Sequence, residues 1–242
     1  TLPVLEAGDG WTFLGWFTNA TSGTTPVIPA SGVLPSPDTF GESTNLYAHW
    51  QANTYTVAYN CNGGTGTVAN STATYDSAFT ARATSGCSRT GYTVGDKWQI
   101  GDTNNVWTNG TTWTYTENKT FKATWTPNIY HITLNKNNCT TAGTTDVYEK
   151  YDIGWSTTTG SMSNTWTMTQ VTVPSKSGYH FVGYYDNANG TGTKYIDENG
   201  TLPVNNTFST DKTLYAICAA NTNTLTLNKN GGTGTIKNNV YS

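Results

Sequence analysis

Three short signatures recur in a fixed order along the 242-residue chain, and this internal repeat constrains the fold more than any other feature. A strand-like segment that runs into turn residues comes first, at residues 55–64, 130–138 and 223–232. A Gly-aromatic segment comes second, beginning at Gly10, Gly91 and Gly178. A segment similar to Leu-Tyr-Ala-x-Trp closes each unit, at residues 46–50, 121–125 and 214–218. Such self-similarity predicts a row of small units rather than one large domain.

The order of the signatures divides the chain into four parts. Residues 53–127 and 128–222 carry all three signatures and are predicted to be complete repeat units, the second with an insertion near Trp155–Met168. Residues 1–52 correspond to the C-terminal half of a unit. Residues 223–242 correspond to the N-terminal strand region of a further unit.

The composition indicates strands rather than helices. Thr occurs about 50 times and Asn about 26 times. Thr, Tyr, Trp and Val suit the pleated strand, and segments such as Tyr55–Tyr59 alternate polar with apolar residues. At most one short helix per unit is expected, for instance near Tyr75–Ala83. We therefore predict a mainly β fold.

The charge balance excludes two classes of function. The chain has 12 Lys+Arg against 15 Asp+Glu and a formal net charge of -3, so it lacks the basic excess that nucleic-acid binding requires. No apolar run approaches the length of about 18 residues that a membrane-spanning helix needs. The nine Trp, 15 Tyr and seven Phe also argue against a disordered tail.

The three signatures carry a family resemblance. The order Asn-Gly-Gly-Thr, Gly-Tyr-x-Phe-x-Gly-Tyr and Leu-Tyr-Ala-x-Trp resembles the internalin-type B-repeat, also called the Listeria–Bacteroides repeat; examples lie at residues 62–65, 178–184 and 46–50. The resemblance implies small β-grasp-like units in an elongated array on secreted or surface-anchored proteins. The chain departs from the pattern at Gly95-Asp-Lys-Trp98, where Gly-Trp is expected, and at Cys218, which replaces the closing Trp.

The four cysteines allow three pairings, and each complete unit holds two of them. No pair has Cys-x-x-Cys spacing, which argues against zinc or thioredoxin-type chemistry. In the unit that the resemblance implies, the first and last strands are parallel neighbours, so Cys139 and Cys218 would lie at the same edge. We predict the disulfides Cys61–Cys87 and Cys139–Cys218; the alternative is four buried free thiols in a cytosolic protein.

The two ends of the chain match each other. Residues 238–242 resemble residues 146–149, and residues 1–4 resemble residues 172–174, so the end of one copy and the start of another make an almost complete unit. Two explanations are open. Either the chain is a window from a longer array, or the C-terminal strand of one molecule completes the N-terminal half of the next. The expected partner is the protein itself in both cases.

Eight asparagines lie in Asn-x-Ser/Thr sequons and are candidate glycosylation sites if the chain passes a glycosylating compartment. In a chain so rich in Asn and Thr, many sequons also arise by chance. The eight are Asn19, Asn70, Asn109, Asn118, Asn138, Asn189, Asn199 and Asn205.

The aromatic residues fall into two groups. One group recurs at signature positions and is expected to form the small cores: Trp11, Trp16, Trp50, Trp125, Tyr179 and Tyr184. The other group has no counterpart in sister units: Trp107, Trp113, Trp155 and Trp166. These four are expected in loops, where a ring can cover the core, contact a neighbouring chain or stack on a sugar.

The sequence holds no recognisable catalytic or metal-binding pattern, and we expect no cofactor. His49, His131 and His180 occupy positions where sister units carry other residues, which indicates surface substitutions. We therefore expect a non-enzymatic, extracellular structural repeat protein that forms a cell-surface stalk, adhesive fibre or filament. The alternative is an adhesin module that binds glycans or a host surface through its loop tryptophans.

Overall fold

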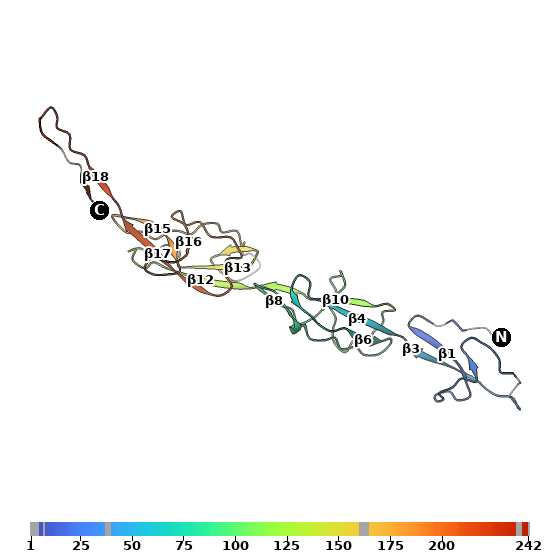
Figure 1. The fold of residues 1–242 in the computed structure, drawn as a ribbon. Helices are drawn as coiled ribbons and strands as arrows, with labels where there is room; N and C mark the ends of the chain where they lie inside the picture. Colours follow the sequence, from blue (N-terminus) through green and yellow to red (C-terminus); the bar gives the residue numbers. More distant parts are fainter. Residues whose placement is uncertain (1–4, 7, 37–39, 160–164, 236–238, 242) are drawn as a thin grey trace. The chain divides into compact units, whose positions relative to one another are not determined.

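A computed structural model describes residues 5–6, 8–36, 40–159, 165–235 and 239–241. The chain forms two compact units, one of residues 1–89 and 94–126 and the other of residues 90–93 and 127–242 (Figure 1). Strands dominate, which confirms the mainly β prediction. Of the predicted insertion, residues 160–164 lie outside the described residues.

The helix expected near Tyr75–Ala83 is wrong. The described part of the chain holds one helical segment, the 3-10 turn Thr84–Gly86. Asp76 has a positive φ of 54°, which ends regular structure there. Its backbone N–H donates to the Trp113 carbonyl at 2.9 Å, so the segment is held by a distant loop rather than by helical hydrogen bonds.

The first compact unit contains a three-stranded and a four-stranded sheet. The three-stranded sheet has the order β2-β1-β3, with β1 Trp11–Phe17, β2 Ile28–Pro29 and β3 Tyr47–Ala52. The four-stranded sheet has the order β6-β4-β10-β9, with β4 Thr54–Asn60, β6 Ser71–Thr74, β9 Gln99–Ile100 and β10 Lys119–Lys122. A two-stranded sheet joins β5 Thr65–Gly66 to β7 Cys87–Ser88. A further two-stranded sheet joins β8 Tyr92–Val94 to β11 Trp125–Pro127, and its residues 92–93 and 127 are counted with the second compact unit.

The second compact unit contains a six-stranded sheet and a hairpin. The sheet has the order β14-β13-β12-β17-β15-β16. Its strands are β12 Ile129–Asn135, β13 Asp146–Lys150, β14 Gly154–Ser156, β15 Tyr179–Tyr185, β16 Lys194–Ile196 and β17 Lys212–Ala220. The hairpin pairs β18 Asn223–Leu225 with β19 Asn239–Tyr241.

In each predicted complete repeat, the first and last strands are parallel neighbours. β4 pairs with β10 from Val57↔Lys119 to Asn60↔Lys122. β12 pairs with β17 from Ile132↔Lys212 to Asn135↔Tyr215, and Figure 1 shows these two strands side by side. The ladders start and end at equivalent positions, so the two repeats share one pairing scheme.

The half-repeat at residues 1–52 has the same register as the second half of repeat 128–222. β1 pairs with β3 from Trp11↔Ala52, and β15 pairs with β17 from Tyr179↔Ala220. Both ladders shift at the same place, between Phe13 and Gly15 and between Phe181 and Gly183. A side chain on Gly15 or Gly183 would lie within 2.6 Å of a neighbouring backbone oxygen, so glycine is required at this bulge.

The two complete repeats have separate hydrophobic cores of different composition. The core of repeat 53–127 is aromatic: Val57, Ala73, Phe79, Ala81, Cys87, Trp98, Ile100, Trp107, Trp113, Phe121 and Ala123. The core of repeat 128–222 is mainly aliphatic: Ile132, Leu134, Cys139, Val147, Trp155, Val171, Tyr184, Ile196, Leu202, Phe208, Leu214, Ala216 and Cys218.

The signature aromatics contribute unequally to these cores. Tyr184 is fully buried, as expected. Trp50 and Tyr179 remain 36% and 37% exposed, so the expectation that they are core residues is wrong. Tyr179 is the first residue of β15, and the Lys176 ammonium lies 3.7 Å from its ring centroid. Trp50 lies on β3, an edge strand whose one neighbour among the described residues is the antiparallel strand β1.

Candidate functional site

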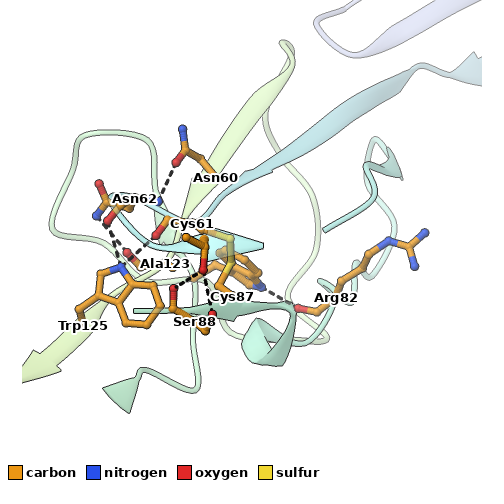
Figure 2. Close-up of a disulfide and its surroundings, with 10 residues drawn as sticks. Asn60, Cys61, Asn62, Arg82, Cys87, Ser88, Ala123 and Trp125 are labelled. Atoms are coloured by element: carbon orange, nitrogen blue, oxygen red, sulfur yellow. Dashed lines mark hydrogen bonds between the residues drawn. A yellow bond between two sulfur atoms is a disulfide. The ribbon is translucent and has the colours of Figure 1, made fainter. Parts of the chain in front are cut away.

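The first disulfide joins Cys61 to Cys87 beside the end of β4 (Figure 2). The two Cα atoms are 5.4 Å apart and the residues are separated by 26 positions. The Trp125 indole N–H donates to the carbonyls of Cys61 and Asn62, at 2.9 and 3.0 Å. The bridge, the closing Trp and the turn after β4 therefore form one connected cluster, as Figure 2 shows.

The second disulfide joins Cys139 to Cys218 and spans 79 positions. Asn138 pairs with the backbone of Cys218: its side-chain N–H₂ donates to the Cys218 carbonyl at 3.0 Å, and its side-chain oxygen accepts from the Cys218 N–H at 2.9 Å. Both predicted disulfides are thus confirmed. The second one clamps the chain just after the first strand to the last strand of the same sheet, as the resemblance implied.

An asparagine follows the last strand of the half-repeat, and its backbone groups and side-chain oxygen are all hydrogen-bonded. The Asn53 N–H donates to the Gly10 carbonyl at 2.8 Å, and the Asn53 carbonyl accepts from the Tyr75 N–H at 2.9 Å. The Asn53 side-chain oxygen accepts a hydrogen bond from the Thr12 hydroxyl. Asn53 is also the single residue between β3 and β4, so the two strands are joined by a short, hydrogen-bonded junction.

Asn128 repeats this arrangement in the second compact unit. Its N–H donates to the Gly91 carbonyl at 2.9 Å, its carbonyl accepts from the Tyr151 N–H at 3.0 Å, and its side-chain oxygen accepts from the Thr93 hydroxyl at 2.6 Å. A side chain on Gly91 would lie 2.3 Å from the Tyr151 ring. The Tyr151 ring therefore packs directly on the backbone of Gly91, as the Tyr75 ring packs on Gly10 in the first unit.

The third junction, at Asn221, keeps only part of this pattern. The Asn221 N–H donates to the Gly178 carbonyl at 2.9 Å, and its side-chain oxygen lies 3.0 Å from His180 Nδ1. Within the described residues, no atom lies within 4 Å of where a Gly178 side chain would begin. Among the described residues, no tyrosine ring covers Gly178 as Tyr75 covers Gly10 and Tyr151 covers Gly91.

The candidate glycosylation asparagines lie mostly on the surface, but several have structural partners. Asn109 accepts a hydrogen bond from the Ala81 N–H at 2.9 Å, and Asn118 accepts one from the Thr56 N–H at 2.8 Å. The Asn138 amide is used on both sides by Cys218. Asn205 is half-buried; Asn19, Asn70, Asn189 and Asn199 are exposed. Their modification remains a prediction.

Three of the four loop tryptophans are not available to a ligand. Trp107, Trp113 and Trp155 are 5%, 0% and 3% exposed, so of the three roles expected for these rings they cover the core and are not accessible to a sugar or to another chain. Trp107 and Trp113 lie in loops that fold back over the sheet, because each small unit needs apolar cover for its inner face. Trp155 lies in β14, an edge strand of the six-stranded sheet, and not in the loop that was expected. Trp166 is half-buried and has the Lys150 ammonium 5.6 Å from its ring centroid.

A pocket of 630 Å³ lies in the half-repeat and was not expected from the sequence. Its walls include the rings of Trp11, His49 and Trp50, with Glu6 and Thr21 as polar neighbours. The sequence contains no direct sign of this pocket. Trp11 and Trp50 were expected in a hydrophobic core, but in the half-repeat they line the pocket instead.

One buried carboxylate belongs to the second repeat. Glu149 is fully buried and accepts hydrogen bonds from the backbone N–H groups of Thr207 and Phe208, both at 2.9 Å. Burial raises its pKa above the ordinary value, and the two hydrogen bonds oppose this shift only in part. The carboxylate fastens the loop before β17 to β13, which is a structural role.

The histidines have separate surroundings. His131 Nε2 lies 2.8 Å from an Asp146 oxygen, while His49 Nε2 lies 2.8 Å from the Asn19 carbonyl oxygen. The pKa of Asp146 is lowered, first by the Thr145 hydroxyl and then by His131. Across the residues with described positions, no three His, Cys, Asp or Glu side chains gather where a metal ion could bind. No helix in that same part of the chain is long and apolar enough to cross a membrane.

Tandem small β units with separate sheets and cores, two of them stapled by disulfides, define a structural repeat protein. The sequence model of the Listeria-Bacteroides repeat domain matches residues 55–124 and 130–217, which is more than half of the chain. The chain therefore belongs to the Listeria-Bacteroides repeat family, a non-catalytic repeat type found in surface proteins. No solved structure matches the chain.

Proposed function

We propose that this chain is an extracellular structural repeat protein of the internalin B-repeat type, serving as a cell-surface stalk, adhesive fibre or filament. The observation that carries the proposal is the pair of disulfide-stapled repeats with one residue between consecutive strands at Asn53 and Asn128. Repeats built in this way extend a chain without adding a binding site to every unit.

The cysteine chemistry supports an oxidising location. All four cysteines are paired, and disulfides persist in secreted and surface proteins but are rare in the cytosol. The exposed surface is rich in Thr and Asn and poor in charge, since charged residues make up 11% of the chain. Such a surface offers few cleavage sites for proteases that recognise Lys or Arg.

The thiol state of the protein in its native cells tests the proposal. Intact cells would be treated with a membrane-impermeant alkylating reagent before and after reduction, and the protein would be analysed by mass spectrometry. We expect alkylation only after reduction, and loss of the protein when intact cells are treated with a nonspecific protease. Four thiols alkylated only after lysis would contradict a surface location.

A second candidate function, glycan binding, is supported by the pocket of the half-repeat. Its two tryptophans could stack on a sugar ring, and Glu6, Thr21 and His49 could bond the hydroxyl groups. A glycan array probed with the full chain tests this function. Binding that is lost in Trp11→Ala and kept in Trp166→Ala would support it, because only Trp11 lines the pocket.

A further inference from the structure

We propose that the Gly-aromatic turn of one repeat is folded by the repeat that follows it, through a clasp that this chain forms twice. Each clasp joins a glycine and a threonine of one repeat to an asparagine and a tyrosine of the next. The first clasp contains Gly10, Thr12, Asn53 and Tyr75, and the second contains Gly91, Thr93, Asn128 and Tyr151. The inference goes beyond the proposed function, because it holds wherever the protein is located.

The tyrosine of each clasp stands at the same place in its repeat. Tyr75 directly follows β6, and Tyr151 directly follows β13; both strands pair antiparallel with the first strand of their repeat. The next residue is an aspartate with a positive φ in both cases, 54° at Asp76 and 55° at Asp152. Asp is one of the few residues besides Gly that adopt this left-handed conformation readily. The Tyr-Asp pair therefore ends the strand in the same way in both repeats.

The asparagine of each clasp is held from both sides. In the second clasp, the Asn128 N–H donates to the Gly91 carbonyl at 2.9 Å, and the Asn128 carbonyl accepts from the Tyr151 N–H at 3.0 Å. The Asn128 side-chain oxygen accepts from the Thr93 hydroxyl at 2.6 Å. The first clasp has the same three hydrogen bonds, made through Asn53. The turn that starts at Gly91 thus gains two hydrogen bonds from outside its own repeat.

The tyrosine ring of each clasp covers the glycine of the preceding repeat. Gly10 and Gly91 are both buried, and a side chain on either one would overlap the ring of Tyr75 or Tyr151. Both glycines also have a positive φ, 83° and 76°, which most other residues adopt only with strain. The Gly-aromatic signature therefore supplies a bare backbone surface on which the next repeat packs its tyrosine.

The aromatic residue after the glycine adds a further contact to each clasp. Trp11 and Tyr92 meet the ring of the clasp tyrosine edge to face, with ring centroids 6.1 and 5.8 Å apart. Edge-to-face pairs stabilise beyond the apolar area that they bury. The Tyr92 hydroxyl also donates to an Asp152 carboxylate oxygen at 3.0 Å. Both residues of the Gly-aromatic pair are therefore used by the following repeat.

The division of the chain into compact units supports the same assignment. Residues 90–93 lie in the sequence of repeat 53–127, but they are counted with the second compact unit. All contacts of the second clasp lie within that unit, and all contacts of the first clasp lie within the first compact unit. The folded unit is thus out of phase with the sequence repeat. The stability of such a row includes a separate contribution from each pair of neighbours.

A double-mutant cycle on the full chain tests the second clasp. Gly91→Ala places a methyl group where the Tyr151 ring lies and strains the backbone; in the Tyr151→Ala background only the strain remains. We expect Gly91→Ala to lower the Tm of the wild type by at least about 4 °C more than it lowers the Tm of Tyr151→Ala. Equal decreases in the two backgrounds overturn the inference.

Hydrogen exchange followed by NMR locates the effect. The reporter is the Asn128 amide, which bonds to the Gly91 carbonyl across the clasp, and the reference is the Leu134 amide, which bonds to the Thr145 carbonyl within repeat 128–222. In Tyr151→Ala we expect the Asn128 amide to exchange about tenfold faster relative to the reference. Tyr151→Phe keeps the ring and is expected to exchange like the wild type.

A matched control removes a tyrosine outside the clasp. Tyr148 is half-buried on β13, as Tyr151 is just after it, but its ring stacks on His131. Tyr148→Ala is expected to leave the relative exchange of Asn128 unchanged. The same acceleration in Tyr148→Ala and Tyr151→Ala, or none in either, overturns the inference. The surface location is untouched by these results, because the alkylation experiment tests it independently.

Discussion

The two complete repeats share the parallel pairing of the first strand with β10 or β17 but fill their cores differently. Repeat 53–127 covers its sheet with tryptophans from loops and places its disulfide beside the turn after β4. Repeat 128–222 uses mainly aliphatic residues, buries one carboxylate and bridges its first strand region to its last strand. The parallel strand ladder is therefore common to both repeats, while the loops can supply quite different cover for the same sheet.

The largest difference is expected from the disulfides. A bridge stabilises mainly by restricting the unfolded chain, and longer loops gain more: about 4.5 kcal/mol for a separation of 79 residues against about 3.5 kcal/mol for 26. Replacing Cys139 and Cys218 with Ser should therefore destabilise repeat 128–222 by more than the replacement of Cys61 and Cys87 destabilises repeat 53–127. Denaturant unfolding, followed by hydrogen exchange of each repeat separately, measures both losses. Equal losses would show that loop length does not determine them.

The next effect concerns the aromatic cover. Trp113 is fully buried against Phe79 and Trp107, so Trp113→Ala should destabilise repeat 53–127 by roughly 4 kcal/mol. Trp166 is half-buried, and Trp166→Ala should cost only about 1 kcal/mol in repeat 128–222. The same unfolding measurement compares them. A small loss at Trp113 would mean that its loop is not part of the folded core.

Removing the hydroxyl group of two tyrosines should change the free energy of unfolding by a smaller amount, and with opposite sign in the two repeats. The Tyr184 hydroxyl is buried with no hydrogen-bond partner in the described structure, and burial raises its pKa to about 12. Tyr184→Phe should therefore stabilise repeat 128–222 by about 1 kcal/mol. Tyr59 contacts the Ser71 hydroxyl at 3.0 Å and accepts from the Arg82 N–H at 3.1 Å, so Tyr59→Phe should destabilise repeat 53–127 by a similar amount. A loss at both positions would indicate an ordered water on Tyr184.

The smallest expected effect is the pH dependence caused by a buried carboxyl group, which among the described residues only repeat 128–222 has. Glu149 occupies the position that Ala73 has in the other repeat. Because the folded pKa of Glu149 lies above the ordinary value of 4.5, the folded state holds its proton to higher pH than the unfolded chain does. Stability from this group should therefore fall as pH rises from 4.5 through the folded pKa. Thermal unfolding of Glu149→Gln should lack this slope; an unchanged slope would assign it to another group.

The recurring signatures predicted the framework of the fold well, because they mark positions that every repeat uses in the same way. Cys139 and Cys218 follow or end signature strands, so a parallel arrangement of those strands brought them together. Gly15 and Gly183 stand at the bulge of the sheet, where no other residue fits. The recurring signatures thus predicted the parallel pairing of the strands, and this pairing predicted that Cys139 and Cys218 lie close together.

The covering residues could not be predicted in the same way. Trp107, Trp113 and Trp155 occur once each, so their segments had no sister sequence to indicate which way the rings point. The burial of Trp107 and Trp113 depends on how far their loops return over the sheet, and that of Trp155 depends on the pairing of β14 with β13; both are tertiary effects. The pocket beside Trp11 and Trp50 was missed for the opposite reason. Both residues recur in the signatures and were therefore expected in a core, but residues 1–52 form only half of a repeat and leave them lining a pocket.

The parallel arrangement of β12 and β17 has a mechanical consequence. The chain enters the sheet at the start of β12 and leaves at the end of β17, so tension on the repeat would slide the two strands past each other and load all their hydrogen bonds at once. The disulfide between Cys139 and Cys218 connects the chain just after β12 to β17, so it transmits the tension directly from one strand to the other. The long segment between the cysteines would thus stay slack under tension, and a stretched repeat would lengthen only by the short ends outside the bridge.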